Sequence, residues 1–281
     1  RDVAPSRGLG DVYKRQLENW KLMMLIRKYS DYVRWPIRTD VETTEKYETG
    51  EVDEAGIQKM GVRTVTKEEV VNSMIPIWQR PKSQVKDEEY NEFYKSKFGD
   101  WQDPLLTIHV SAEGSVEYKA LLYIPGQVPM NYFTTDFKKG LQLYSSGVLI
   151  MENCEDLLPD HFRFVRGIVD SQDLSLNISR EMLQHNRQLT FIAGNLEKKI
   201  KNELLDLMKN NREVYEKFYA AFGRQLKYGV VADYGAHKEA CQDLLLFWSH
   251  KEGKLVSLQA YVLSLIHISE PTRRSYISYA V

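Results

Sequence analysis

Long apolar runs, cysteine and net charge are all scarce in this chain of 281 residues. No uninterrupted apolar stretch approaches the roughly 18 residues that a membrane-spanning helix needs. The two cysteines, Cys154 and Cys241, show neither a disulfide framework nor metal-ligand spacing, which indicates a reducing cytoplasm as the location. The formal net charge is −1, so no overall field attracts nucleic acid or an anionic membrane. We therefore expect neither of these as a partner.

The motifs of several self-sufficient enzymes are also missing. Gly253-Lys254 lacks the upstream glycine of a phosphate-binding loop, and no dinucleotide-binding fingerprint follows a predicted strand. No His-Glu-x-x-His pair and no nucleophile elbow organise the polar residues. The six histidines are scattered, and we assign His109, His161 and His185 to surface or packing positions, so no metal site is predicted. The chain alone is not expected to be an active enzyme.

Both ends of the chain have an unusual origin. Residues 6–16 (SRGLGDVYKRQ) and 263–273 (LSLIHISEPTR) resemble in-frame translations of the transposon adapter used in sequencing libraries. We therefore interpret 1–16 and 263–281 as adapter-derived and exclude them from fold reasoning. The remaining residues, 17–262, are expected to be an internal piece of a longer protein. Their length suits one large domain or two small ones, and the chain's 43% hydrophobic and 27% charged residues suit a globular protein.

Hydrophobic periodicity predicts the organisation of this insert. A helix is expected at 17–33 and a short strand at 32–37. Residues 38–72 are rich in charge, threonine and glycine and poor in large apolar side chains, so we interpret them as a charged linker at a domain boundary. The remaining patterns predict strands at 105–110, 116–124, 141–144 and 148–151, and helices at 87–98, 156–165, 181–216 and 238–248. This order indicates an α/β fold, with an α/β lobe followed by a smaller helical lobe.

The most informative segment is 167–184, a polar loop that leads into a helix. Asn177 and Ser179 are good helix caps, because their side-chain oxygens accept the first unpaired amides. Arg180 follows the cap, and Gln184 lies one turn later on the same helical face. A loop that presents arginine and glutamine together could grip a phosphate and its water. From the pattern alone, an ordinary capped surface helix remains an alternative.

The same segment resembles the catalytic loop of the heat-shock protein 90 chaperone family. It reads VDSQDLSLNISREMLQ over 169–184, against the family's run VDS-x-DL-x-LN-x-SRE-x-LQ. Further matches keep the family's order and are LIRKYSDY at 25–32, IWQRPKS at 77–83, EEYNEFY at 88–94, DWQDPL at 100–105, LLYIP at 121–125, FVRG at 164–167 and VSLQAYV at 256–262. The resemblance covers nearly all of the insert. It implies the end of a nucleotide-binding domain at 17–37 and the family's middle domain at 73–262, an α/β sandwich of the ribosomal-protein-S5-like kind with a smaller following lobe.

The resemblance also implies site residues. In the family, the arginine at the Arg180 position reaches the γ-phosphate of ATP held by the N-terminal domain, and Gln184 matches a glutamine that assists it. Asn177 would shape the loop near the nucleotide. Arginines supplied across an interface contribute about 10³–10⁵ in rate. The implied cofactor is ATP with Mg in the intact parent, and none is expected to bind this chain alone.

One strand departs from the family pattern. Many relatives carry two arginines and a phenylalanine where this chain has Ser146, Gly147 and Leu149. Leu149 is expected to keep an apolar contact with the nucleotide domain, whereas a phosphate contact by this strand is not expected.

Client proteins are the other implied partners. Trp78 falls at a tryptophan that the family exposes to clients, although it could equally belong to the core together with Ile75 and Ile77. Tyr132 and Phe133 resemble an amphipathic client-contacting loop. The parent is expected to be a cytoplasmic homodimer whose middle domain also meets its own N-terminal ATPase domain.

Two other classes of protein remain possible. One is the transducer domain of gyrase and mismatch-repair ATPases, which typically offers a lysine to the γ-phosphate and a basic surface to DNA. Arg180 and the net charge of −1 argue against it. The other is an interaction module without a catalytic role, against which the Arg180 and Gln184 pair argues.

Overall fold

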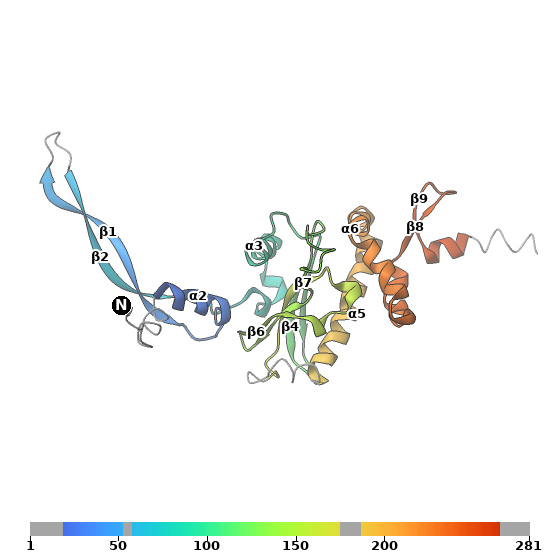
Figure 1. Cartoon of the computed structure of the whole chain (residues 1–281), viewed down its shortest axis with the longest axis horizontal. Helices are drawn as coiled ribbons and strands as arrows, with labels where there is room; N and C mark the ends of the chain where they lie inside the picture. The colour runs from blue at the N-terminus through green and yellow to red at the C-terminus, as the bar shows by residue number, and fades with distance from the viewer. Residues whose placement is uncertain (1–18, 53–57, 175–186, 265–281) are drawn as a thin grey trace, which may run out of the picture. The chain divides into compact units, whose positions relative to one another are not determined.

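The computed structural model describes residues 19–52, 58–174 and 187–264 (Figure 1). The chain divides into two compact units. The first comprises residues 1–79 with 146–150, and the second comprises residues 80–145 with 151–281. Among the described helices, none is long and apolar enough to cross a lipid bilayer.

The first unit begins with a helix and a long hairpin. Helix α2 (Asn19–Tyr29) confirms the helix predicted at 17–33, whereas 32–37 form turns and bends instead of the predicted strand. Strands β1 (Arg38–Val52) and β2 (Gln58–Val70) then pair antiparallel.

This hairpin differs from the charged linker that the composition of 38–72 indicated. Many of its described side chains are exposed, and Arg38 and Glu68 form an ion pair across the strands at 3.1 Å. Main-chain hydrogen bonds join the two strands, and alternation lets polar side chains reach solvent from both faces. Composition carried no information on strand pairing.

Asn72 holds together the turns that precede the hairpin. Its side chain is buried, and its amide donates to the carbonyl oxygens of Val33 (3.0 Å) and Trp35 (2.9 Å). Its Oδ1 accepts from the backbone amide of Ile37 at 2.7 Å. These hydrogen bonds satisfy main-chain groups that have no partner in a strand. Buried polar groups need such partners.

A five-stranded mixed sheet has the order β3-β4-β7-β5-β6. Strands β3, β4 and β7 pair antiparallel, and β5 pairs parallel with β7. Its strands are β3 (Leu106–Ala112), β4 (Tyr118–Ile124), β5 (Leu141–Ser145), β6 (Val148–Cys154) and β7 (Arg166–Asp170). Four of them confirm the predicted strands, while β7 was not predicted.

The second unit also holds the helices and a small terminal hairpin. The helices are α3 (Asp87–Phe98), α5 (Arg187–Asn210), α6 (Arg212–Val231) and α7 (Lys238–Cys241), and the hairpin joins β8 (Leu246–Ser249) to β9 (Lys254–Ser257). Helix α3 has the predicted bounds. It starts with three acidic residues, which favour a helix N-terminus, and ends at Gly99, whose φ of 64° suits glycine.

Strand β4 is buried on both faces. Successive side chains of a strand point to opposite sides. Tyr123 donates its hydroxyl to the carbonyl oxygen of Tyr90 on α3 at 3.2 Å, whereas Tyr118 lies beside Asn195 on α5. The two helices therefore cover opposite faces of the sheet, which explains why six of the seven residues of β4 are buried.

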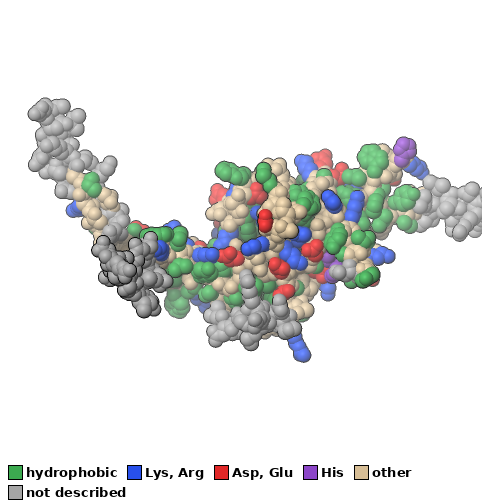
Figure 2. Space-filling view, in the orientation of Figure 1, with side chains coloured by type: hydrophobic (Ala, Val, Ile, Leu, Met, Phe, Trp, Pro, Cys, Tyr) green, Lys and Arg blue, Asp and Glu red, His purple; other side chains and the backbone are tan. Residues whose placement is uncertain are grey.

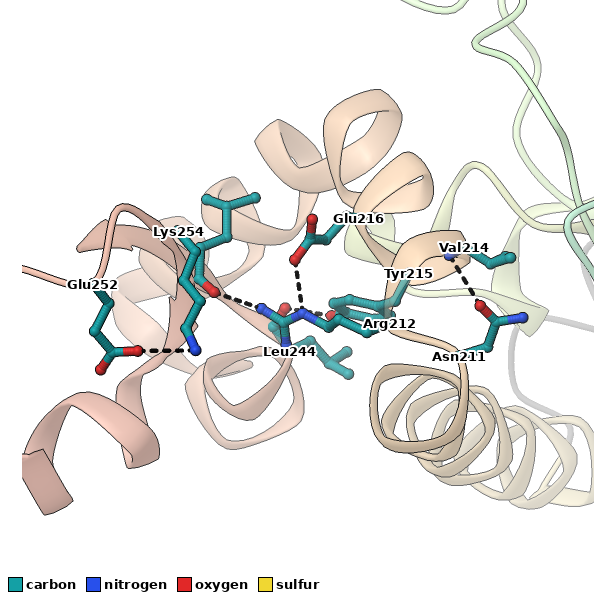
Figure 3. Close-up of polar contacts among 9 residues, drawn as sticks. Asn211, Arg212, Val214, Tyr215, Glu216, Leu244, Glu252 and Lys254 are labelled. Atoms are coloured by element: carbon teal, nitrogen blue, oxygen red, sulfur yellow. Dashed lines mark hydrogen bonds and ion pairs between the residues drawn. The ribbon is translucent and has the colours of Figure 1, made fainter. Parts of the chain in front are cut away.

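Polar contacts attach the terminal hairpin to α6 (Figure 3). Arg212, the first residue of α6, donates to the carbonyl oxygen of Leu255 and to the carboxylate of Glu216, both at 2.9 Å. Tyr215 lies one turn further and donates its buried hydroxyl to the carbonyl oxygen of Leu244 at 2.5 Å. The start of α6 thus fixes the segment that leads into β8.

Two predicted helices are wrong in part. Residues 156–165 form the short 3-10 turns η3 (Glu155–Leu157) and η4 (Asp160–Phe162), because Pro159 restrains Leu158 to an extended backbone. Of the helix predicted at 238–248, only the first residues form a helix, α7, and the last residues of the predicted range belong to β8. A short apolar run such as 244–248 does not distinguish helix from strand by periodicity alone.

Candidate functional site

The entry to the candidate catalytic loop is anchored by buried serines. The loop follows β7, and Ser171 donates its hydroxyl to the carbonyl oxygen of Glu117 at 2.7 Å. Ser145, at the end of β5, donates its hydroxyl to the carbonyl oxygen of Leu174 at 2.6 Å. Ser145, Ser171 and Leu174 are all buried. The two serines therefore hold the chain where it leaves the sheet.

Further hydrogen bonds restrain the same segment. The backbone amide of Ser171 donates to the carbonyl oxygen of Tyr144 at 3.2 Å. The carboxylate of Asp173 accepts from the backbone amide of Glu117 at 2.8 Å. Each such bond contributes about 0.5–1.5 kcal/mol net, and leaving a buried partner unsatisfied costs more. These hydrogen bonds therefore fix the position of the chain at the start of the loop.

Beyond the loop, α5 supplies the second fixed point. It starts at Arg187, and its residues Leu189 and Ile192 are buried. The candidate catalytic and nucleotide-binding residues Arg180, Gln184 and Asn177 lie outside the described residues. Their roles stay predictions.

Trp78 belongs to the core. It lies in η1 (Ile77–Gln79) with 0% of its surface exposed, and its ring meets that of Tyr32 edge-on at a centroid distance of 4.6 Å. Ile75, which the core alternative also included, is 72% exposed. The expectation of an exposed client contact at Trp78 is therefore corrected: the indole could reach a client only by leaving its pocket.

The predicted client loop divides into one buried and one exposed aromatic residue. Tyr132 is buried, and its ring packs against Phe137 and Phe222 with centroid distances of 4.9 and 5.8 Å. Phe133 is 64% exposed, and the guanidinium of Arg224 lies 5.5 Å from its ring centroid. The structure thus leaves Phe133 as the available surface residue and makes Tyr132 a core residue.

The turn at 146–147 departs from the family pattern and has its own backbone requirement. Ser146 and Gly147 have φ angles of 50° and 81°, as a tight hairpin turn between β5 and β6 needs. A Cβ at Gly147 would collide with the carbonyl oxygen of Tyr32. Leu149, the predicted interdomain contact, is 8% exposed. Because Leu149 is nearly buried, its side chain exposes only a small apolar area to a further domain.

A histidine cluster was missed by the sequence analysis. His161, Glu197 and His237 come from η4, α5 and the residue before α7, and their candidate ligand atoms all lie within 4.8 Å of one another. His161 was assigned to a surface or packing position. The three members of the cluster lie far apart in the sequence, so no spacing pattern could have indicated it.

Charges of both signs are interspersed on the face shown in Figure 2. Lys, Arg, Asp and Glu side chains alternate over the second unit without a continuous basic stripe on that face. This distribution fits the net charge of −1 and offers no electrostatic footprint for a nucleic-acid backbone there.

Both the sequence and the fold are similar to those of known proteins. The family described as Hsp90 protein matches residues 50–268. The chaperone protein HtpG of Clostridium perfringens (strain ATCC 13124) is 52% identical over 269 residues, which is 96% of this chain and 41% of that protein. The chaperone protein HtpG of Bacillus subtilis (strain 168) is 50% identical over 270 residues, again 96% of this chain and 41% of that protein.

A solved structure agrees with these relatives. The middle domain of a heat shock protein of Plasmodium falciparum superposes with a TM-score of 0.59 at 28% identity, covering 67% of this chain and 73% of that one. The mixed sheet with its following helices is thus a chaperone middle-domain fold. The chain belongs to the Hsp90 family.

The extent of these matches bears on the ends. The chain spans about two fifths of the length of the curated relatives, 41% in each case. Alignments over 269 and 270 residues necessarily include part of the segments 1–16 and 263–281. The adapter boundaries therefore stay a prediction.

Proposed function

We propose that this chain is the middle part of an ATP-dependent molecular chaperone. In this proposal, Arg180 and Gln184 act on ATP with Mg that a separate nucleotide-binding domain holds. The main support is the loop segment itself, which carries the family's residues and starts from a platform of buried hydrogen bonds at Ser145 and Ser171. Asn177 shapes the loop, and the chain alone binds no nucleotide.

The proposed mechanism depends on closure between domains. When the nucleotide-binding domain meets the middle domain, the guanidinium of Arg180 donates to the charge that develops on the γ-phosphate. Such a contact belongs to the transition state more than to ground-state binding. The hydrogen bonds at Ser145 and Ser171 fix the start of the loop, which favours a defined position for Arg180 in the closed state.

The test uses Arg180→Ala in a full-length protein that joins this chain to the remaining domains of a relative. ATP turnover should fall at least tenfold while the Kd for ATP stays within about twofold, since the arginine acts after closure. Arg180→Lys should rescue only in part, because a point charge does not reproduce a planar two-pronged donor. Arg187→Ala, at the exposed start of α5, is the matched control. Wild-type turnover in Arg180→Ala would refute the mechanism.

We also propose that clients contact the exposed residues of the loop near Phe133. Met130 and Phe133 present apolar side chains to solvent, at 105% and 64% exposure. Phe133→Ala in the full-length protein should weaken the binding of an unfolded protein severalfold with little change in Tm. Unchanged binding would remove the proposed contact. A cytoplasmic location and a homodimeric parent that meets its own ATPase domain complete the proposal.

A further inference from the structure

Three segments that are distant in sequence bring metal-ligand side chains together in the second unit. Nε2 of His161 lies 3.1 Å from Oε1 of Glu197, and Nδ1 of His237 lies 3.9 Å from the same oxygen. Two imidazoles and one carboxylate therefore face a common point between η4, α5 and the start of α7.

The contact between His161 and Glu197 has the distance of a hydrogen bond but not its angle. Nε2 is completely buried, and within the described part of the chain it has no hydrogen-bond partner of acceptable geometry, although the carboxylate oxygen is close. The oxygen thus lies away from the direction in which the ring N–H would point. An unsatisfied buried nitrogen is costly and calls for an explanation. A cation bound between the two atoms would satisfy both lone pairs.

The donor set selects the kind of cation. Imidazole nitrogen with one carboxylate suits Zn²⁺ and similar transition metals, whereas Ca²⁺ and Mg²⁺ prefer oxygen ligands only. With metal–ligand bonds of about 2.0–2.1 Å, neighbouring tetrahedral ligands lie about 3.3 Å apart. The His161–Glu197 pair is already near that value, and the His237–Glu197 pair needs a small closing movement.

The residues around the cluster let an ion enter from solvent and keep the three ligand side chains close together. The side chains of Glu197 and His237 are 28% and 38% exposed, so an ion can reach them from solvent. Lys201 donates to the carbonyl oxygen of Glu239 at 2.5 Å and to the carboxylate of Asp243 at 2.9 Å, which holds α7 against α5. His237 is therefore kept on the side of Glu197.

A buried thiol lies near these residues, although its sulfur is not among the ligand atoms that lie within 4.8 Å of one another. Cys241 follows His237 by one helical turn and is buried. A Cβ placed on Gly229 of α6 would collide with Cβ of His161 and lie 3.0 Å from the sulfur of Cys241, so the thiol and the imidazole border the same glycine. The close approach that Gly229 allows lets the Cys241 thiol and the His161 side chain pack against the same point of α6.

We propose that His161, Glu197 and His237 form a binding site for Zn²⁺, with a water molecule in the fourth position. The ion would join η4, α5 and α7 and stabilise the helical part of the second unit. This inference is independent of the proposed ATPase mechanism.

The test is a Zn²⁺ titration of the purified full chain after chelator treatment. Calorimetry should give one Zn²⁺ per chain, and Zn²⁺ at about 100 times its Kd should lower the unfolded fraction about 100-fold. His237→Ala and Glu197→Gln should each weaken binding at least tenfold. Both residues are partly exposed, so these variants are expected to fold, whereas His161→Ala could fail to do so.

His250→Ala is the matched control, because His250 is exposed in the β8–β9 turn. It should bind Zn²⁺ like the unmodified chain. Absence of stoichiometric binding would overturn the site and leave only the contact between His161 and Glu197. Equal affinity in His237→Ala would also overturn it, since the ion would then be held elsewhere.

Discussion

Replacement of Trp78 by alanine tests whether this residue is core or client surface. The side chain is 0% exposed and packs edge-on against Tyr32. Burying an aromatic side chain removes about 150–250 Å² from water, which at about 25 cal/mol per Å² is worth about 4–6 kcal/mol. Measured Trp→Ala changes in cores cost about 3–5 kcal/mol. We therefore expect Trp78→Ala to lower the free energy of unfolding of the first unit by about 4 kcal/mol.

Urea unfolding followed by far-UV circular dichroism measures this loss. With an m value of about 2 kcal/mol/M, the midpoint of the affected transition should fall by about 2 M. Trp101→Ala is the matched control: Trp101 is 94% exposed, and its loss should change stability by less than about 0.5 kcal/mol. A change below about 1 kcal/mol in Trp78→Ala, together with weaker binding of an unfolded protein, would refute the core assignment.

Two further predictions concern buried polar groups. The hydroxyl of Tyr132 is buried and has no hydrogen-bond partner among the described residues, so Tyr132→Phe should keep or raise Tm; a loss above about 1 kcal/mol would reveal a partner. Burial raises the pKa of Cys154 to about 11 and that of Cys241 to about 12, so neither thiol of the folded chain should react quickly with a thiol reagent at pH 8. The raised pKa values of the two thiols stabilise the folded chain, and this contribution is fully present below about pH 8.5. It is lost as the pH rises toward 11–12, because the unfolded chain releases its thiol protons first. Rapid labelling of both thiols before unfolding, or stability constant to pH 11, would contradict this assignment.

Local patterns were sufficient for several elements. Helix α3 has its acidic first turn and its terminal glycine within one short stretch, so its bounds could be predicted from the sequence. The strands of the β3–β4 and β5–β6 hairpins likewise follow apolar stretches separated by turn residues. The family resemblance also depended on the sequence alone, because the loop motif is a linear run of residues.

Strand pairing and burial needed the tertiary structure. Strand β7 joins the sheet through partners on β4 and β5, and the β1–β2 hairpin is held by main-chain bonds that composition does not report. Trp78 and Phe133 are both large and apolar, yet one is buried and the other exposed. The path of the chain decided this difference, not the residue type.

The histidine cluster shows the same limit most clearly. Its members are far apart in sequence, and no spacing rule connects His161 with Glu197. They meet because η4 and α7 both pack against α6, which itself packs against α5, and Gly229 lets the segments approach closely. The sequence alone determined the family, the loop residues and most local elements, because these are encoded in contiguous patterns. Only the tertiary structure decided which side chains are buried and which distant ones share a site, because both depend on contacts between segments that are not neighbours in the chain.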